Sequence, residues 1–278
     1  MNRSLRAVNT AILIIFLVLI TFCVLYPLVF CISASVSPGS SISDMAILPF
    51  AKGITFEHFV YLFQQTDYPL WFRNTLIIAT ATSILTVLVA SLGAYVFSRF
   101  RFALKKSMML GLLILQIFPS FVGMIAIYVI LYRIGGLDKL WGLVLVYLAG
   151  NIPYNTWLVK SYIDTIPVSL DEAARIDGAN NLRTFFTIIL PVAKPILIFL
   201  AIASFTGPWM DFIFPKMVLR SSENQTLALG LFSFVTDRKN DFTSFAAGAM
   251  LVSVPFVIFF VVSQKLLVTA MGSAAVKE

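Results

Sequence analysis

Residues 167–191 read PVSLDEAARIDGANNLRTFFTIILP and form the longest strongly polar segment of an otherwise apolar chain. Ser169, followed three places later by Glu172, is a capping box, which predicts a helix that starts at Leu170. Gly178 supplies a residue that readily adopts the left-handed conformation in which helices end. The segment is therefore predicted to begin with one short helix and a sharp turn.

A second short helix is predicted from about Asn181, ending before Pro191. Together the two helices form a projecting knob, and a helix that lies in a groove of another protein is a common mode of recognition. The small side chains of Ala173 and Ala174 permit close approach to such a partner. The residues alone leave a second interpretation open, in which Glu172 only caps its own helix.

The composition places the chain in a membrane. Of 278 residues, 59% are hydrophobic, only 12% are charged and 26 are phenylalanine, which is more apolar surface than a soluble domain of this size hides. The net charge of +7 comes from basic residues between apolar spans, so it does not indicate a nucleic-acid partner. Cys23 and Cys31 lie about 12 Å apart along one predicted helix, too far to form a disulfide. The single histidine, His58, has no ligand-type neighbour in the sequence, so we expect a surface residue and no metal site.

Six apolar segments, each about as long as a bilayer core requires, predict an all-α, polytopic membrane protein with a single domain over residues 1–278. The predicted spans are about residues 11–33, 74–98, 107–132, 140–159, 195–214 and 242–264, the first as an uncleaved helix. They leave outer loops at 34–73, 133–139 and 215–241, and an inner loop at 160–194. Pro119 interrupts the third span.

The distribution of lysine and arginine sets the orientation. With both termini in the cytoplasm, twelve of the 20 basic residues lie inside, and a cluster of four directly follows the second span. The inner set is Arg3, Arg6, Arg99, Arg101, Lys105, Lys106, Lys160, Arg175, Arg183, Lys194, Lys265 and Lys277. The knob is then cytoplasmic.

The order E-A-A, three residues, G, nine residues, I-x-L-P resembles the EAA loop of membrane subunits of binding-protein-dependent ABC importers. Every fixed position of that pattern is present, at Glu172, Ala173, Ala174, Gly178, Ile188, Leu190 and Pro191. Three further stretches are similar to the carbohydrate branch of these permeases: WFRNT at 71–75, IGGL at 134–137 and PWMDF at 208–212. The stretch TLALG at 226–230 is similar to the shorter membrane subunit of maltose and maltodextrin importers. Met210 departs from the pattern, because many sugar permeases carry asparagine there.

The resemblance implies a type I ABC importer permease in the cytoplasmic membrane, working with a sister permease, two copies of an ATPase and an extracytoplasmic solute-binding protein. The knob would fit a cleft on the ATPase. The loop before the sixth span would contact the binding protein, which maps loosely onto Thr236, Asp237, Arg238, Lys239 and Asn240.

Polar residues inside apolar spans are candidates for a solute pathway, since they are costly in hydrocarbon unless they face protein or water. The candidates are Asn151, Tyr154 and Asn155 around Pro153, and Trp209 and Asp211. Simpler interpretations remain: a proline kink satisfied by a neighbouring helix, and an interfacial Asp211 beside an aromatic belt. Asn74 is interpreted as an interfacial cap.

The sequence lacks the motifs of nucleotide hydrolysis, zinc proteolysis and serine hydrolysis. The chain contains no G-x-x-x-x-G-K-[ST], H-E-x-x-H or G-x-S-x-G, so we expect no enzyme activity and no bound cofactor, and any ATP hydrolysis must come from a partner. Two alternatives to a maltodextrin-type importer stay open: a permease for another oligosaccharide, a glycerol phosphate or an osmolyte, and a membrane enzyme or passive channel.

Overall fold

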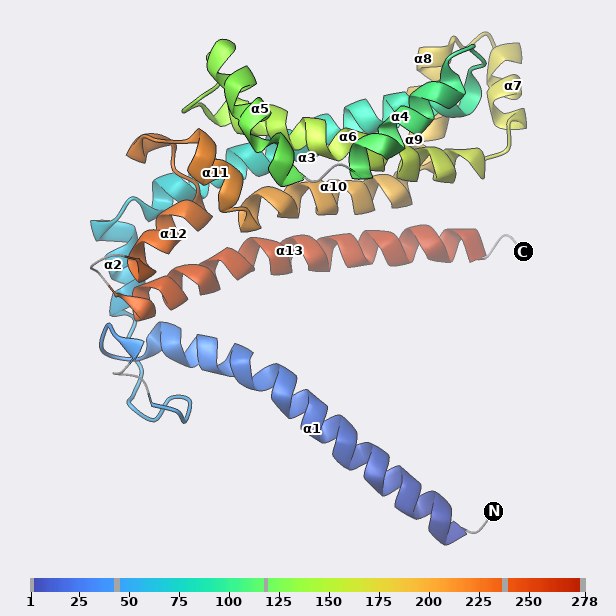
Figure 1. Cartoon of the computed structure of the whole chain (residues 1–278). Helices are drawn as coiled ribbons and strands as arrows, with labels where there is room; N and C mark the ends of the chain where they lie inside the picture. Colours follow the sequence, from blue (N-terminus) through green and yellow to red (C-terminus); the bar gives the residue numbers. More distant parts are fainter. Residues whose placement is uncertain (1–2, 43–45, 118–119, 237–239, 276–278) are drawn as a thin grey trace. The chain divides into compact units, whose positions relative to one another are not determined.

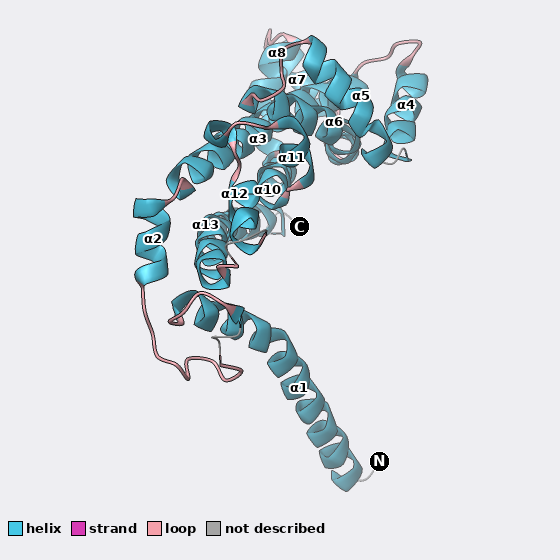
Figure 2. Ribbon diagram, turned by 60° about the vertical axis from the view of Figure 1, so that its left-hand side comes forward, coloured by secondary structure: helices cyan, strands magenta, loops and turns pink. Residues whose placement is uncertain are grey.

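A computed structural model describes residues 3–42, 46–117, 120–236 and 240–275. Those residues form helices and loops, with no strand among them (Figure 2), so the predicted all-α class is confirmed. The chain divides into two compact units. Unit 1 comprises residues 1–69 and 230–254, and unit 2 comprises residues 70–229 and 255–278.

Unit 1 is built from α1 (Arg3–Val36), α2 (Glu57–Gln65) and the first part of α13 (Phe242–Ala275). Helix α2 packs through Leu62, which is fully buried. Gly248 of α13 is a close-contact position, because a Cβ there would lie 2.3 Å from Leu231 and 3.3 Å from Tyr68. The glycine therefore permits close packing of α13 within unit 1.

His58 differs from its predicted role as an ordinary surface residue. Its ring is half-buried, with Nε2 2.9 Å from the Ser37 carbonyl oxygen and Nδ1 3.4 Å from Thr243 Oγ1. The Thr243 hydroxyl also donates to the Gly39 carbonyl at 2.7 Å. The histidine thus joins three segments that are distant in sequence, which a search for metal ligands does not reveal.

The remaining helices are α3 (Tyr68–Arg99), α4 (Lys105–Ile117), α5 (Ser120–Arg133), α6 (Leu140–Asp164), α7 (Ser169–Ile176), α8 (Asn181–Thr184), a π-helical turn (Phe185–Ile189), α9 (Leu190–Val192), α10 (Lys194–Met210), α11 (Ile213–Val218), a 3-10 turn (Ser222–Asn224) and α12 (Leu227–Val235). The first two residues of α3 and the part of α12 from Gly230 onward belong to unit 1, and the rest, with the second part of α13, lies in unit 2. Within this unit, α7 and α8 lie beyond one end of α6, and α11 lies beside the other end (Figure 1).

Three helices are long and apolar enough to cross a bilayer, with candidate segments Ile12–Val36, Tyr68–Arg99 and Phe242–Phe259. The number among the described residues rises to five if each of two bent pairs counts as one span: α4 with α5, bent by 108°, and Asn181–Val192 with α10, bent by 82°. The helix of the fourth predicted span, α6, is not among these candidates. Pro119, expected to interrupt the third span, lies outside the described residues.

Several helices differ in extent from the predicted spans, whose bounds stay predictions. The helix of the second predicted span begins at Tyr68, ahead of residue 74, and α6 continues to Asp164. The fifth ends at Met210, because Asp211 is extended, and the outer loop after it contains α11 and α12. Asn74 is no cap: it is buried inside α3, and its amide donates to the carbonyls of Glu223 and Gln225 at 2.8 and 3.0 Å.

The turn between α5 and α6 is tied to the segment after α11. Asp138, at φ 56°, accepts hydrogen bonds at 3.0 Å from the backbone N–H groups of Arg220 and Ser221 and from the Ser221 hydroxyl. Burial raises the pKa of the Asp138 carboxyl, but these bonds outweigh it and hold the pKa below its usual value. A charged carboxylate therefore fixes this end of unit 2.

Candidate functional site

The predicted knob is present as α7 and α8, joined by a turn at Gly178 with φ 79°. The expected capping box is not formed. The first helix begins at Ser169, one residue earlier than predicted, and no side chain caps it. Glu172 is instead exposed to solvent, so the interpretation in which it only caps its own helix is wrong.

The acidic residue that α7 does bury is Asp171. Its Oδ2 lies 2.9 Å from Arg99 Nε, and the two side chains are only 3% and 6% exposed. Tyr95 donates its hydroxyl to Asp171 Oδ1 at 3.4 Å, and Arg99 also donates to the Ile166 carbonyl at 2.8 Å. This buried pair joins the first knob helix to the end of α3.

An apolar cluster lies beneath the pair and extends the anchorage. It draws side chains from α3, α6, the π-helical turn and α10, and from the short connections after α6 and before α10: Ala90, Ala94, Tyr95, Val159, Ile163, Ile166, Phe185, Ile189, Ala193, Leu197 and Leu200. The rings of Tyr95 and Phe185 are centred 5.2 Å apart. Because the cluster is buried on all sides, the knob and three long helices share one core.

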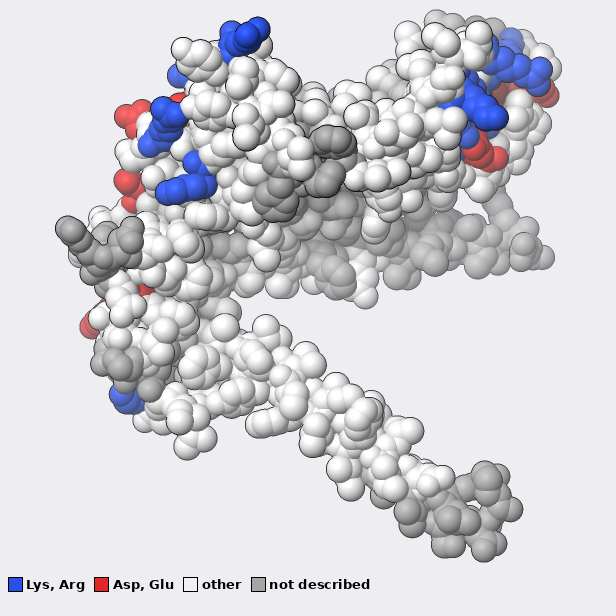
Figure 3. All heavy atoms as spheres, in the orientation of Figure 1, with Lys and Arg blue, Asp and Glu red and all other residues white. Residues whose placement is uncertain are grey.

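The outer face of the knob carries the motif residues. Glu172 and Ala173 are exposed, whereas Ala174 is 3% exposed and packs inward. Ile176 and Leu182 stand beside them with 87% and 64% of their surface exposed. A small, partly apolar, exposed surface on a buried base is typical of a protein-docking site. Figure 3 shows charged side chains gathered at this end of unit 2 and at the α5 and α11 end.

The second arm of the knob runs further than predicted. Asn180 caps α8 by accepting the Arg183 N–H at 2.8 Å, and the helical path then continues through the π-helical turn and α9 to Val192. Ile188 and Leu190 are half-buried along it, and Pro191 is exposed. Pro191 does not stop the helix, because it stands in the first turn of α9, where its missing N–H is tolerated.

Of the pathway candidates, Asn151 lines a groove. The groove encloses about 900 Å³ between α4, α5 and α6, with Phe214 at its edge. Most of its wall is apolar, and the polar side chains are those of Gln116, Tyr147 and Asn151. A mainly apolar cavity with a few polar groups is typical of small-molecule sites.

Asp211 lies next to that groove and acts through Tyr147. It accepts the Tyr147 hydroxyl at Oδ2 over 2.9 Å and caps the start of α11 by accepting the Ile213 N–H at Oδ1 over 2.8 Å. Each oxygen of the Asp211 carboxylate thus accepts a hydrogen bond from within unit 2. The bond to Tyr147 fixes the direction of a side chain that lines the groove. Sequence reasoning missed Tyr147, since one tyrosine in an apolar helix carries no signal.

The other pathway candidates lie apart from the groove. Trp209 is 1% exposed, and its ring packs edge-on against Phe72 and Phe256 at 5.3 and 5.9 Å. Asn155 is buried and donates to the Asn151 carbonyl at 2.8 Å, which supports the helix around Pro153 locally. Tyr154 is 57% exposed on the outside of α6.

The expected binding-protein contact is described only at its ends. The Thr236 hydroxyl donates back to the Phe232 carbonyl at 3.0 Å, and Asn240 has φ 41°. Asp237, Arg238 and Lys239 lie outside the described residues.

Among the described residues, no group of three histidine, cysteine or acidic side chains is placed to hold a metal. Cys23 and Cys31 are free and exposed.

Comparison with known proteins gives consistent matches. Residues 87–273 match the family described as binding-protein-dependent transport system inner membrane component. A maltodextrin transport system permease protein of Bacillus subtilis is 39% identical over 279 residues, which cover 100% of both chains. A galactooligosaccharides transport system permease protein of the same organism is 39% identical over 99% of this chain and 97% of its own.

A solved structure supports the fold. One chain of a bacterial ABC transporter involved in the import of the acidic polysaccharide alginate aligns with a TM-score of 0.81 and 22% identity, covering 95% of this chain and 98% of that one. Residues of the knob, of the groove and of the Asp171–Arg99 pair all fall within the family match.

Proposed function

Because the chain belongs to the family of binding-protein-dependent transport system inner membrane components, we propose that it is a transmembrane subunit of an ATP-driven ABC importer for a carbohydrate, a maltodextrin-type oligosaccharide. The single observation that carries the mechanism is the knob: an exposed Glu172 and Ala173 surface on a base locked to α3, α6 and α10. The similarity to a maltodextrin permease over the whole chain supports the substrate class.

In this mechanism the chain transmits a conformational change, and the partner ATPases supply the energy. ATP binding closes two partner ATPases around the knobs, and the buried core transfers that movement to the spans, so that the inner gate closes as the outer gate opens. A ligand shifts such an equilibrium only through contacts that differ between the two states. The knob provides those contacts, and its rigidity determines how much of the motion reaches α3.

We further propose that the chain crosses the inner membrane six times, with both termini in the cytoplasm. Its partners are then a sister permease and an extracytoplasmic binding protein that contacts residues 236–240. Solute passes beside the groove that contains Asn151 and Tyr147. The chain itself needs no cofactor and no nucleic acid, and the lipid bilayer surrounds its apolar helices.

Charge reversal on the knob tests the proposal. Glu172→Lys and Gly178→Asp should abolish sugar uptake by the reconstituted importer while the chain remains inserted. Glu223→Lys is the matched control, because that glutamate is exposed at the opposite end of unit 2. ATPase stimulation that survives unchanged in Glu172→Lys would contradict the coupling role.

Crosslinking places the knob directly. After Cys23 and Cys31 are replaced by serine, a cysteine introduced at Ala173 should crosslink to the ATPase in the assembled importer. Labelling of that cysteine by a membrane-impermeant reagent from outside the cell would overturn the orientation.

A second substrate is favoured by one finding, the equal identity of the chain to a galactooligosaccharide permease. Competition between maltodextrins and galactooligosaccharides for uptake separates the two. Transport or catalysis without any ATPase would instead support the channel or enzyme alternative.

A further inference from the structure

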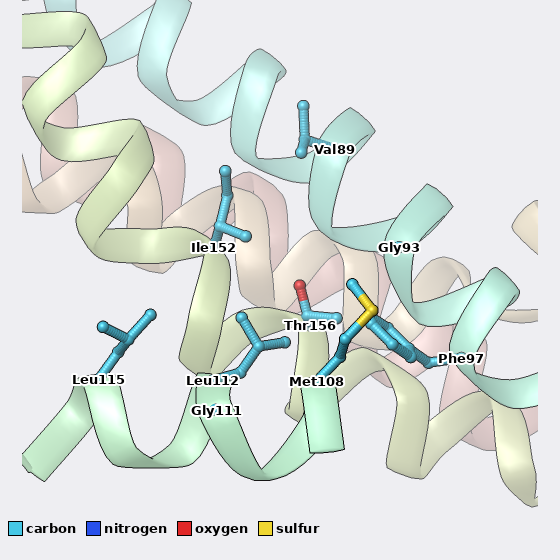
Figure 4. Close-up of a pocket in the computed structure, with 9 residues that line it drawn as sticks. All are labelled: Val89, Gly93, Phe97, Met108, Gly111, Leu112, Leu115, Ile152 and Thr156. Carbon is cyan, nitrogen blue, oxygen red and sulfur yellow. The ribbon is translucent and has the colours of Figure 1, made fainter. Parts of the chain in front are cut away.

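A second groove in unit 2 takes no part in the function proposed above. It encloses about 500 Å³ between α3, α4 and α6 (Figure 4), within the roughly 300–1,000 Å³ of small-molecule sites. Gly93 and Gly111 open its walls, and a Cβ at Gly111 would meet nothing within 4 Å. Thr156 is the one lining residue with a polar side chain. A sugar, which needs many hydrogen-bonding partners, does not match such a lining.

One end of this groove leads to a group of charges. Phe97 and Met108 lie at that end in Figure 4. The residue after Phe97, Ser98, makes polar contacts through both its carbonyl and its hydroxyl group. The Lys105 ammonium lies 3.5 Å from the Ser98 carbonyl and 3.3 Å from that of Phe100. Asp164 accepts the Ser98 hydroxyl at 2.6 Å.

Each wall of the groove continues to a basic residue. Thr156 is followed one helical turn later by Lys160, which pairs with Asp164 at 2.6 Å. Met108 is preceded one turn earlier by Lys105, and Arg101 follows Phe97 just beyond the end of α3. Lys105 and Lys160 therefore both act on one carboxylate, Asp164, and the exposed Arg101 in the loop between α3 and α4 adds a further positive charge, which leaves an excess of positive charge. Burial raises the pKa of Asp164, but the bonds from Lys160 and Ser98 outweigh it and hold the pKa below its usual value.

We propose that this groove binds an anionic phospholipid of the membrane, with one acyl chain between α3, α4 and α6 and the head group on Arg101, Lys105 and Lys160. An apolar slot that opens onto excess positive charge at a helix end complements both parts of such a lipid. Lysine and arginine at span ends direct their charged groups toward the interface where head groups lie.

Photolabelling tests the site on the chain purified with the subunits that remain bound to it, in nanodiscs. The probes are phosphatidylglycerol and phosphatidylcholine, each with a diazirine at the end of one acyl chain. Phosphatidylglycerol should label peptides that contain residues 108–115 and 152–156 more strongly than phosphatidylcholine does. Arg101→Gln should lower the phosphatidylglycerol labelling about five-fold, the equivalent of roughly 1 kcal/mol per basic residue near a membrane surface.

Lys106→Gln is the matched control, because Lys106 lies roughly 200° around α4 from Met108 and should leave the labelling unchanged. Gly111→Phe fills the groove and should remove labelling there by both probes, whereas Gly111→Ala should not. Equal labelling by the two probes, an equal loss in Arg101→Gln and Lys106→Gln, or a groove covered by another polypeptide in the assembled importer each overturns the proposal.

Discussion

Loss of the buried Asp171–Arg99 pair should loosen the knob before it unfolds the rest of unit 2. In Asp171→Asn the side chain keeps its size, but the Arg99 guanidinium stays buried without its counter-charge, since both groups are almost fully covered. Removing one partner of a buried pair costs about 3–5 kcal/mol. Because about 1.4 kcal/mol corresponds to a factor of ten, local opening of α7 should become about 10²-fold to roughly 4 × 10³-fold more frequent.

Hydrogen exchange followed by mass spectrometry measures this opening. Peptides that cover residues 169–178 should exchange faster by that factor in Asp171→Asn, while peptides from the apolar part of α3 stay protected. Sugar uptake should fall, and ATP hydrolysis should lose its dependence on the binding protein, because a loose knob no longer moves α3.

Two further variants test whether the Asp171–Arg99 pair anchors the knob. In the double variant Arg99→Met with Asp171→Leu the loss of protection should be smaller than in either single variant, because no unpaired charge remains. Asp164→Asn removes a pair in which the carboxylate is 44% exposed, so it should cost only about 0.2–1 kcal/mol. Unchanged exchange in Asp171→Asn, or a double variant that costs the sum of the two singles, would refute the anchoring role.

Two other predictions concern the α5–α6 end of unit 2. Gly142→Ala should lower the apparent melting temperature of the purified chain, since its Cβ would lie 2.1 Å from the Gly136 carbonyl oxygen and overpacking costs about 1–3 kcal/mol; Gly150→Ala, whose Cβ meets nothing within 4 Å, should not lower it. Asp138 has a depressed pKa when folded, so its contribution to stability is complete above the ordinary aspartate value of 3.8 and is lost as the pH falls through the lower folded value. Hydrogen exchange at the Ser221 amide, corrected for its intrinsic rate, should therefore become faster in the wild-type chain as the pH falls through the folded pKa of Asp138. In Asp138→Asn the corrected exchange rate should not change over that pH range.

The periodicity and apolarity of the chain were enough to predict helices, the polar knob and the turn at Gly178. These features follow from local rules, because an apolar segment must bury its backbone polar groups in a helix, and a glycine tolerates the positive φ at which a helix ends. The motif from Glu172 to Pro191 also carried the family by itself, since its fixed residues and spacings are read along the chain.

Tertiary structure decided which acidic residue of the knob is buried. Glu172 and Asp171 are neighbours in sequence, and local capping rules favour Glu172 as the residue that bonds to the helix start. Asp171 is nevertheless the buried one, because Arg99 and Tyr95, which lie about 70 residues earlier in α3, bind its carboxylate. The same reason applies to Asn74, Tyr147 and His58, whose partners lie far away along the chain. Pairing between distant side chains depends on how helices pack, and no spacing within one segment encodes it.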